Sequence, residues 1–288
     1  MGILEGKTAV ITGSTRGIGL AIAEAYAREG AKLVISSRSQ AAVDETVNHL
    51  RKAGSKAVGL ACDVSQQEQV MALANFAVQN FGKVDIWFNN AGLETAYGPT
   101  MSYSAEDFTR VVQTNIMGVY YGSRAALQLF TPQRSGKLIN MVGKGYKGPT
   151  PYQNAYAASK AWVFSFTKSL AQEYADSGIS IFNFSPGLVI TDMLTRFDVI
   201  EGHEHRLKNF PAVVRVLGRT PDHPARKAVW AASSATDGKT GLLINSFSSR
   251  VIFESVIREL ARLVTRRPAE TPEIHMRSVP PVELGVLK

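Results

Sequence analysis

Short runs of β-branched and other apolar residues alternate along this chain with longer segments in which apolar residues recur at helical spacing. An apolar run of roughly four to eight residues predicts a strand buried on both faces of a sheet. Helical segments between such runs predict right-handed crossovers between parallel strands. We therefore expect an α/β fold with a doubly wound parallel sheet. The expected strands lie at 8–11, 33–36, 57–60, 85–88, 138–142, 179–182 and 241–244, and the first two helices at 18–28 and 41–52.

The length of 288 residues fits one such domain with an appendage, because open α/β domains often exceed 200 residues. We expect a single domain over 1–248, with an irregular substrate loop at about 192–224. The remaining residues, 249–288, form a C-terminal extension made of an amphipathic helix at 250–266 and a proline-containing tail. This helix is expected either to cover the substrate entrance or to join subunits.

Composition excludes several classes of protein. The single cysteine, Cys62, excludes an internal disulfide framework and a multi-cysteine metal cluster. The first residues lack the apolar run of a signal peptide, and no apolar stretch approaches the ~20 residues of a membrane span. We expect a cytoplasmic protein. The net charge of +8 is compatible with nucleic acid, a membrane surface or an anionic small molecule, so the positions of the charges must decide.

A glycine-rich turn follows the first expected strand directly and precedes the first helix. It reads Thr12-Gly13-Ser14-Thr15-Arg16-Gly17-Ile18-Gly19. Glycines at such a turn allow the backbone to approach a pyrophosphate closely, and the N-terminus of the helix supplies amide donors and a positive dipole. This context predicts a dinucleotide site. It excludes a Walker loop, because Gly-Lys-Ser/Thr does not follow.

The end of the second expected strand indicates which dinucleotide binds. NAD sites usually place an acidic side chain there to accept hydrogen bonds from the ribose hydroxyls. This chain has Ser37 followed by Arg38, with Arg16 in the glycine-rich turn. Two guanidinium groups can bind a 2′-phosphate through charge-assisted hydrogen bonds, whereas a carboxylate would repel it. The sequence therefore predicts NADP(H).

Tyr156 and Lys160 lie four residues apart in an alanine-rich segment that reads as a helix, so both point from one face. A free phenol has a pKa of about 10, and an adjacent ammonium group favours the phenolate. The pair suits proton transfer to or from a substrate oxygen, although this spacing alone is common.

The chain resembles the short-chain dehydrogenase/reductase family, because several motifs occur in that family's order and spacing. They are Thr12 to Gly19, Asn89-Asn90-Ala91-Gly92, Asn115, Tyr156 with Lys160, and Pro186-Gly187. The resemblance spans roughly residues 4–246. It implies a Rossmann-type fold, interconversion of a small-molecule carbonyl and an alcohol by hydride transfer, and assembly into a homodimer or homotetramer.

The resemblance also implies roles for individual residues. Tyr156 would donate or accept the substrate proton, and Lys160 would lower the pKa of that tyrosine while binding the nicotinamide ribose. Asn115 would hold a water that relays protons to Lys160. Asp63 would bind the adenine. The other implied cofactor residues are Val64, Asn90, Ala91, Gly92, Pro186, Gly187, Val189 and Thr191, and Met193 is a candidate for contact with the substrate.

One position departs from the family pattern. The substrate-polarising serine normally lies thirteen residues before the tyrosine, where this chain has Gly143. Loss of one such donor in other enzymes costs around 2.7–4 kcal/mol. Backbone amides or the hydroxyl groups of Tyr146 or Tyr152 could replace the serine, or a large substrate could need the space. Alternatively the protein is a non-catalytic NADP(H)-binding regulatory module, although the retained Tyr156, Lys160 and Asn115 count against this.

The segment from Gly143 to Pro151 and the stretch from Ser185 to Asp192 are similar to the chlorophyll(ide) b reductase branch, which also lacks the serine. That similarity implies reduction of a formyl group to a hydroxymethyl group. The lack of a transit peptide counts against a plastid protein.

Three further features carry no prediction of a site. His203 and His205 flank one glutamate in a loop, which is usually exposed to solvent, and we predict no metal. No basic-aromatic motif or helix-turn-helix supports binding of nucleic acid. Cys62 lies in an apolar run and is expected in the core.

Overall fold

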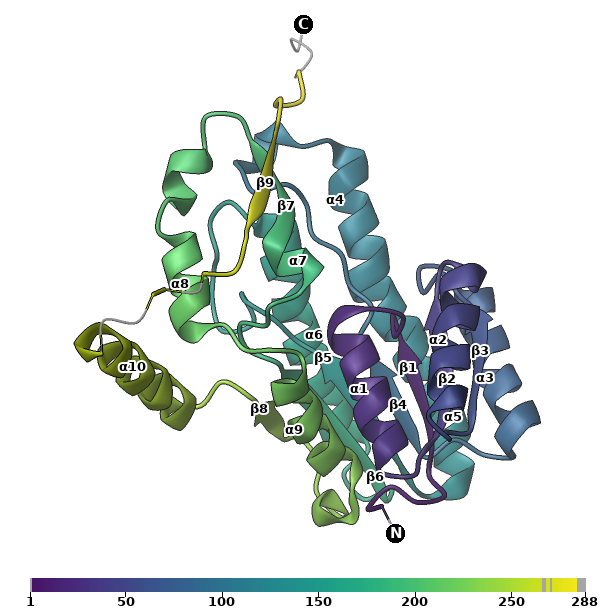
Figure 1. The fold of residues 1–288 in the computed structure, drawn as a ribbon. Helices are drawn as coiled ribbons and strands as arrows, with labels where there is room; N and C mark the ends of the chain where they lie inside the picture. The colour runs from purple at the N-terminus through teal and green to yellow at the C-terminus, as the bar shows by residue number, and fades with distance from the viewer. Residues whose placement is uncertain (1, 266–267, 270, 284–288) are drawn as a thin grey trace, which may run out of the picture.

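A sheet of seven parallel strands forms the centre of the molecule, with helices on both faces (Figure 1). The computed structural model describes residues 2–265, 268–269 and 271–283. The strand order is β3-β2-β1-β4-β5-β6-β8, which confirms the doubly wound parallel sheet of the Rossmann type. The strands are β1 (Thr8–Thr12), β2 (Lys32–Ser37), β3 (Ala57–Ala61), β4 (Ile86–Asn89), β5 (Gly136–Met141), β6 (Ile179–Ser185) and β8 (Leu243–Asn245).

The helices that flank this sheet begin and end at residues suited to those places. Ser39 caps the second helix by accepting a hydrogen bond from the Ala42 amide, and Gly82, with φ of 81°, ends the third. The helices are α1 (Gly17–Arg28), α2 (Gln40–Lys52), α3 (Gln67–Phe81), α4 (Ala105–Val112), α5 (Gly118–Gln133), α6 (Asn154–Glu173) and α9 (Asp222–Ala232).

Each strand contributes to two apolar cores, because successive side chains of a strand point to opposite faces of the sheet. In β1, Ala9 and Ile11 lie in the core beneath α1, α2 and α9, whereas Val10 lies in the core beneath α3, α5 and α6. Burial on both faces explains why the strand sequences are continuous apolar runs rather than alternating ones. The sheet is therefore a rigid support for the loops at its carboxyl edge.

The strand order reverses direction at β1. The chain passes from β1 outward to β2 and β3, and then returns to place β4 on the other side of β1. Loops from the two halves separate at this point and leave a crevice beyond the carboxyl ends of the strands, which is where α/β sheets bind ligands. The glycine-rich turn after β1 and the Asn90-Ala91-Gly92 segment after β4 both lie there.

The segment 192–224, expected to be an irregular loop, contains regular structure. It forms α7 (Asp192–Thr195), β7 (Arg196–Ile200), α8 (Phe210–Leu217) and the start of α9. The expectation was wrong because β7 pairs with a distant strand, β9 (His275–Val279), in the C-terminal tail. In this small parallel sheet Asp198 and Arg277, 79 residues apart, form a two-pronged ion pair at 2.7 and 2.8 Å.

The predicted C-terminal helix is α10 (Ser249–Val264), and its polar side faces the body of the protein. Arg258 donates a hydrogen bond to the Val216 carbonyl, and Glu259 pairs with Arg215 of α8 at 3.0 Å. This is the reverse of an ordinary surface helix, whose apolar side faces the core. The exposed apolar residues are Ile252, Phe253, Val256, Ile257, Leu260, Leu263 and Val264. Across the described ranges, no helix is both long and apolar enough to cross a bilayer.

Candidate active site

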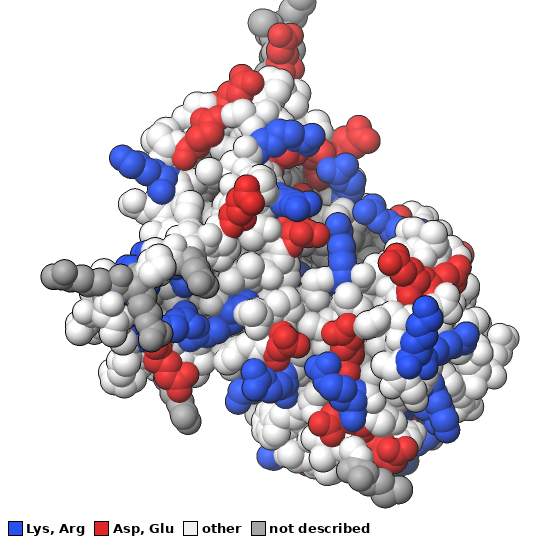
Figure 2. All heavy atoms as spheres, in the orientation of Figure 1, with Lys and Arg blue, Asp and Glu red and all other residues white. Residues whose placement is uncertain are grey.

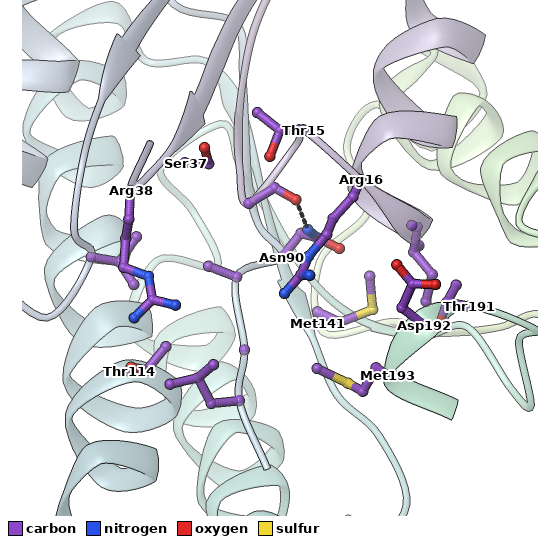
Figure 3. Close-up of a pocket in the computed structure, with 18 of the residues that line it drawn as sticks. Thr15, Arg16, Ser37, Arg38, Asn90, Thr114, Met141, Thr191, Asp192 and Met193 are labelled. Carbon is purple, nitrogen blue, oxygen red and sulfur yellow. Dashed lines mark hydrogen bonds between the residues drawn. The ribbon is translucent and has the colours of Figure 1, made fainter. Parts of the chain in front are cut away.

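A cavity of about 770 Å³ lies in the crevice at the carboxyl edge of the sheet (Figure 3). Its lining brings together most of the residues that the sequence predicts for the cofactor and the reaction. They are Gly13, Thr15, Arg16, Gly17, Ile18, Gly19, Ser37, Arg38, Asp63, Val64, Asn90, Ala91, Gly92, Tyr156, Lys160, Pro186, Thr191 and Met193.

The glycine-rich turn is shaped by close approaches of backbone. Gly13 has a φ of 63°, and a Cβ on it would lie 3.0 Å from the Ala91 Cα. A Cβ on Gly19 would lie 2.3 Å from the Gly13 carbonyl oxygen, so only glycine allows α1 to approach the turn this closely. The Asn90 amide group donates hydrogen bonds to the Thr12 and Gly13 carbonyls at 2.9 and 3.0 Å. The turn therefore fits a pyrophosphate against the N-terminus of α1.

Other predicted residues support the cavity without lining it. Ser14 is buried, donates a hydrogen bond to the Ile11 carbonyl at 2.7 Å and accepts one from the Ser36 amide at 3.0 Å. Val189 is buried in a bridge with Arg219. Gly187 likewise lies outside the lining. These residues connect the loops that bear the lining residues.

Two cations line the cavity: Arg38, which follows β2, and Arg16, which precedes α1. Figure 3 shows the guanidinium groups of Arg16 and Arg38 directed into the cavity from different sides. Both side chains are exposed, and within the described residues neither forms a hydrogen bond or an ion pair. In the face drawn in Figure 2, Lys and Arg side chains surround the hollow among acidic ones. Two unpaired guanidinium groups in one cavity suit an anionic ligand.

Tyr156 and Lys160 lie together on α6 and line the same cavity, with Lys160 buried and Tyr156 half-buried. The Lys160 Nζ lies 5.5 Å from the centre of the Tyr156 ring and donates a hydrogen bond to the Met141 carbonyl at 3.2 Å. Burial lowers the pKa of Lys160 to about 8 and raises that of Tyr156, and the charge of Glu94 raises the pKa of Tyr156 further. Burial and the charge of Glu94 thus act against the lowering of the Tyr156 pKa that the resemblance implies.

Asn115 lies in a π-helical segment, η2 (Gln113–Met117), between α4 and α5. Its side chain accepts a hydrogen bond from the Leu93 amide and donates to the Leu93 carbonyl, both at 2.8 Å, and donates to the Ser159 hydroxyl at 3.0 Å. The side chain is thus committed to holding the loop after β4 against α6. A π-helical turn changes the usual backbone hydrogen bonding and often marks a functional site.

Gly143 lies against the hydroxyl group of Tyr156. A Cβ at position 143 would lie 2.2 Å from the Tyr156 Oη and 3.1 Å from its Cζ. The tyrosine hydroxyl thus occupies the space that a serine side chain would need. The suggested replacements lie elsewhere: Tyr146 packs on Phe164, and Tyr152 packs on Tyr97, and neither lines the cavity.

Sequence reasoning missed some residues that line this cavity. Glu94 follows the Asn89–Gly92 motif by two residues, on the loop after β4, so its place at the reversal of strand order was a usable signal. Arg196 belongs to β7, which was not foreseen. Cys62 also lines the cavity but is buried, and burial raises its pKa to about 12, which agrees with a core residue rather than a nucleophile.

The features of this site match a known family. A family model described as short chain dehydrogenase matches residues 7–199. The chain belongs to the short-chain dehydrogenase family. It is 38% identical over 240 residues to 3beta-hydroxysteroid dehydrogenase 1 of Eggerthella lenta, covering 83% of this chain and 91% of that protein. It is 33% identical to Glucose 1-dehydrogenase 2 of Bacillus subtilis (strain 168), again over 240 residues, covering 83% of this chain and 92% of that protein.

A shorter overlap connects the chain to a plant protein. The chain is 35% identical over 207 residues to the probable chlorophyll(ide) b reductase NYC1 of Arabidopsis thaliana, covering 65% of this chain and 42% of that protein. The resemblance to the short-chain dehydrogenase family, with a weaker likeness to this branch, is thereby confirmed.

Solved structures of the family agree with the fold and with a nicotinamide cofactor. A 3-ketoacyl-(acyl-carrier-protein) reductase from Brucella melitensis complexed with NADH has a TM-score of 0.76 and 32% identity, covering 86% of this chain and 100% of that one. A single-residue variant of actinorhodin polyketide ketoreductase with NADPH also has a TM-score of 0.76, with 28% identity, covering 85% of this chain and 97% of that one. This short-chain dehydrogenase is therefore an oxidoreductase that acts on carbonyl or alcohol substrates with a nicotinamide cofactor.

Proposed function

We propose that the protein uses NADP(H) to interconvert an aldehyde or ketone with its alcohol, with Tyr156 as the proton donor or acceptor. The observation that carries this proposal is that one cavity is lined both by Tyr156 and Lys160 and by the unpaired Arg16 and Arg38. A reacting pair and two anion-binding groups thus line one site. This arrangement suits a dinucleotide that extends between them.

The preference for NADP(H) rests on charge. The residue at the end of β2 is Ser37, whose hydroxyl donates a hydrogen bond to the Ser39 carbonyl. Because this position holds a serine and not an acidic residue, it does not repel a 2′-phosphate. Asp63, the acidic residue among the predicted cofactor residues, accepts hydrogen bonds from the Ser65 amide and hydroxyl at 3.0 and 2.8 Å. Arg16 and Arg38 are then available for the phosphate.

The residues of the chain handle the proton. The nicotinamide ring supplies or accepts the hydride when it is bound. Tyr156 donates its phenolic proton to the substrate oxygen during reduction and takes it back during oxidation. Lys160, oriented by the Met141 carbonyl, favours the phenolate form and replaces its proton. Asn115 positions the loop after β4 beside both groups.

Replacing the phenol tests this proposal. Tyr156→Phe should lower kcat for NADPH-linked reduction by roughly 10²–10⁴-fold, the usual contribution of a general acid. Because the ring remains, the Kd for NADPH, measured by fluorescence titration, should change less than about threefold. Trp162→Phe, an aromatic substitution on the same helix outside the cavity, is the matched control. Unchanged turnover in Tyr156→Phe would rule out its assigned role.

A narrower substrate is favoured by the likeness to the Arabidopsis protein, whose printed name describes a probable chlorophyll(ide) b reductase. Reduction of a formyl group on a chlorin would be the corresponding reaction. To test this candidate, kcat/KM with NADPH is compared for chlorophyllide b and a small aromatic aldehyde. A higher value for chlorophyllide b favours the narrower substrate, and a higher value for the small aldehyde favours a general carbonyl reductase.

We further propose that the protein forms a homodimer or homotetramer. The exposed apolar side of α10 supports this, because a contiguous apolar surface on a protein commonly marks an interface. Ile257→Cys provides a test, since Cys62 is the only natural cysteine and is buried. Oxidation of this variant should give a covalent dimer if two copies of α10 meet, whereas Lys52→Cys, at an exposed residue of α2, should not.

A further inference from the structure

Glu94 lies on a loop that is fixed directly beside the reacting groups. The Asn115 side chain holds the backbone of Leu93 by accepting a hydrogen bond from its amide and donating one to its carbonyl. A Cβ on Gly92 would lie 3.5 Å from both the Asn115 Oδ1 and the Lys160 Nζ. The backbone on the N-terminal side of Glu94 is thus anchored, and the Glu94 side chain lines the same cavity as Tyr156. The electrostatic effect of Glu94 on the pKa of Tyr156 is consistent with this proximity.

The carboxyl group of Glu94 differs from the other acidic groups of the cavity. Asp63 accepts hydrogen bonds from Ser65, and Asp192 is exposed to water. Glu94 is part-buried, and in the part of the chain that the structure describes no group donates a hydrogen bond to it. Burial raises its pKa to about 7. A part-buried carboxyl without donors is costly, so a ligand that supplies a donor is stabilised there.

The charges around the cavity limit which donor fits. Lys160 and Arg196 line the same cavity and disfavour a cationic substrate. A carboxylate on the substrate would be repelled by Glu94 itself. A neutral hydroxyl group satisfies both conditions, because it can donate a hydrogen bond to the carboxylate without carrying charge.

We propose that Glu94 binds a hydroxyl group of the substrate, so that the preferred substrates are neutral carbonyl compounds bearing a further hydroxyl group, or the corresponding polyols. This rests on the proposed function, since it assigns the substrate class of the same site. Glu94 then determines specificity, while Tyr156 retains the chemistry. The hydroxylated substrate should bind more tightly because it forms a charge-assisted hydrogen bond to Glu94, which is stronger than a hydrogen bond between neutral groups.

Matched pairs of carbonyl compounds test this assignment. Glyceraldehyde is compared with propanal, and hydroxyacetone with acetone, each as kcat/KM with NADPH. The parent protein should prefer the hydroxylated member at least about tenfold. In Glu94→Leu the ratio of the two kcat/KM values should fall to within about twofold, because the KM for the hydroxylated member rises relative to that for the unhydroxylated member. Glu94→Gln, which keeps a carbonyl acceptor, should retain part of the preference. Glu106→Leu, which removes an exposed carboxylate outside the cavity, is the control.

Two results would overturn the assignment: an unchanged preference in Glu94→Leu, or a parent protein that prefers the unhydroxylated members. Thermal denaturation and the Kd for NADPH confirm that each variant is folded. If Tyr156→Phe abolishes reduction while Glu94→Leu leaves the preference intact, only the role of Glu94 fails. If no member of any pair is reduced with either nicotinamide cofactor, the proposed function fails, and this inference with it.

Discussion

The cofactor end and the substrate end of the cavity are built in different ways. The cofactor end comes mainly from one stretch of chain, the glycine-rich turn, α1 and the end of β2, each determined by its local sequence. The substrate end depends on backbone hydrogen bonds between segments far apart in the sequence. The Tyr97 amide donates to the Asp198 carbonyl, and the Gly98 amide donates to the Tyr152 carbonyl. The cofactor end is thus determined by local sequence, whereas the substrate end is determined by hydrogen bonds between distant segments.

The C-terminal tail completes that long-range pairing. The amide of Ile200, at the end of β7, donates to the Tyr97 carbonyl, and β9 covers the other edge of β7. The Val282 amide then donates to the Ser102 carbonyl, so the tail also holds the segment that follows Glu94. An unpaired strand edge leaves backbone groups unsatisfied, which is why β7 needs β9. Residues 271–283 therefore support the segments around the substrate end of the cavity without lining it.

The largest expected effect tests the cofactor end. Arg16→Ala combined with Arg38→Asp should raise the Kd for NADPH roughly 100-fold, since two charged hydrogen-bonding groups are lost and one is replaced by a repelling charge. The Kd for NADH should change less than about threefold. Fluorescence titration measures both. Lys52→Ala, at the opposite end of α2, controls for the loss of bulk positive charge, and a parallel loss of NADH affinity would contradict the assignment of these arginines.

A smaller effect is expected from removing β9. A chain that ends at Thr271 should lose at least about tenfold in kcat/KM for the carbonyl substrate, chiefly through KM, because the edge of β7 becomes unpaired. The Kd for NADPH should stay within about twofold. A chain that ends at Glu283 is the control. Arg277→Ala, which removes only the exposed ion pair with Asp198, should lower the melting temperature only slightly and leave kcat/KM nearly unchanged. If the chain that ends at Thr271 lost as much affinity for NADPH as it lost in kcat/KM for the carbonyl substrate, the two ends of the cavity would not be independent.

The smallest expected effect concerns Glu94 and the pH dependence of the protein's stability. The pKa of Glu94 is raised by burial from 4.5 to about 7, so the folded protein binds this proton more tightly than the unfolded chain. The stability associated with that proton is present below pH 4.5 and is lost as the pH rises to about 7. Glu94→Gln should therefore raise the melting temperature at about pH 8 by a few degrees, and the gain should disappear at low pH. Thermal denaturation across this range measures it, with Glu106→Gln as control, and a gain independent of pH would contradict the shift.

The difference between the two ends also determines what the sequence could predict. The strands, the glycine-rich turn and the Arg16–Arg38 pair depend on local patterns, and the structure has them at the expected positions. The segment 192–224 appeared irregular because β7 is stabilised by a strand 79 residues away, which no local pattern indicates. Glu94 was overlooked although it follows the Asn89–Gly92 motif by two residues; only the contacts of its loop with Asn115 and α6 show that it lies beside the reacting groups.

The position of the missing serine shows the same limit. The sequence revealed glycine at position 143 but not the position of the Tyr156 hydroxyl, which lies where a serine side chain would be. Tyr146 and Tyr152 were reasonable replacements by their spacing along the chain. Their rings instead pack against Phe164 and Tyr97, because the apolar contacts of the surrounding helix and loop determine their direction.

The most direct test of the central claim is a comparison of NADPH and NADH as reductants. The rate of cofactor oxidation is measured for one carbonyl compound with the full-length protein, together with the amount of alcohol formed. We predict one alcohol per NADPH oxidised and a kcat/KM at least about tenfold higher with NADPH than with NADH, which corresponds to about 1.4 kcal/mol. An equal or higher kcat/KM with NADH would contradict the account.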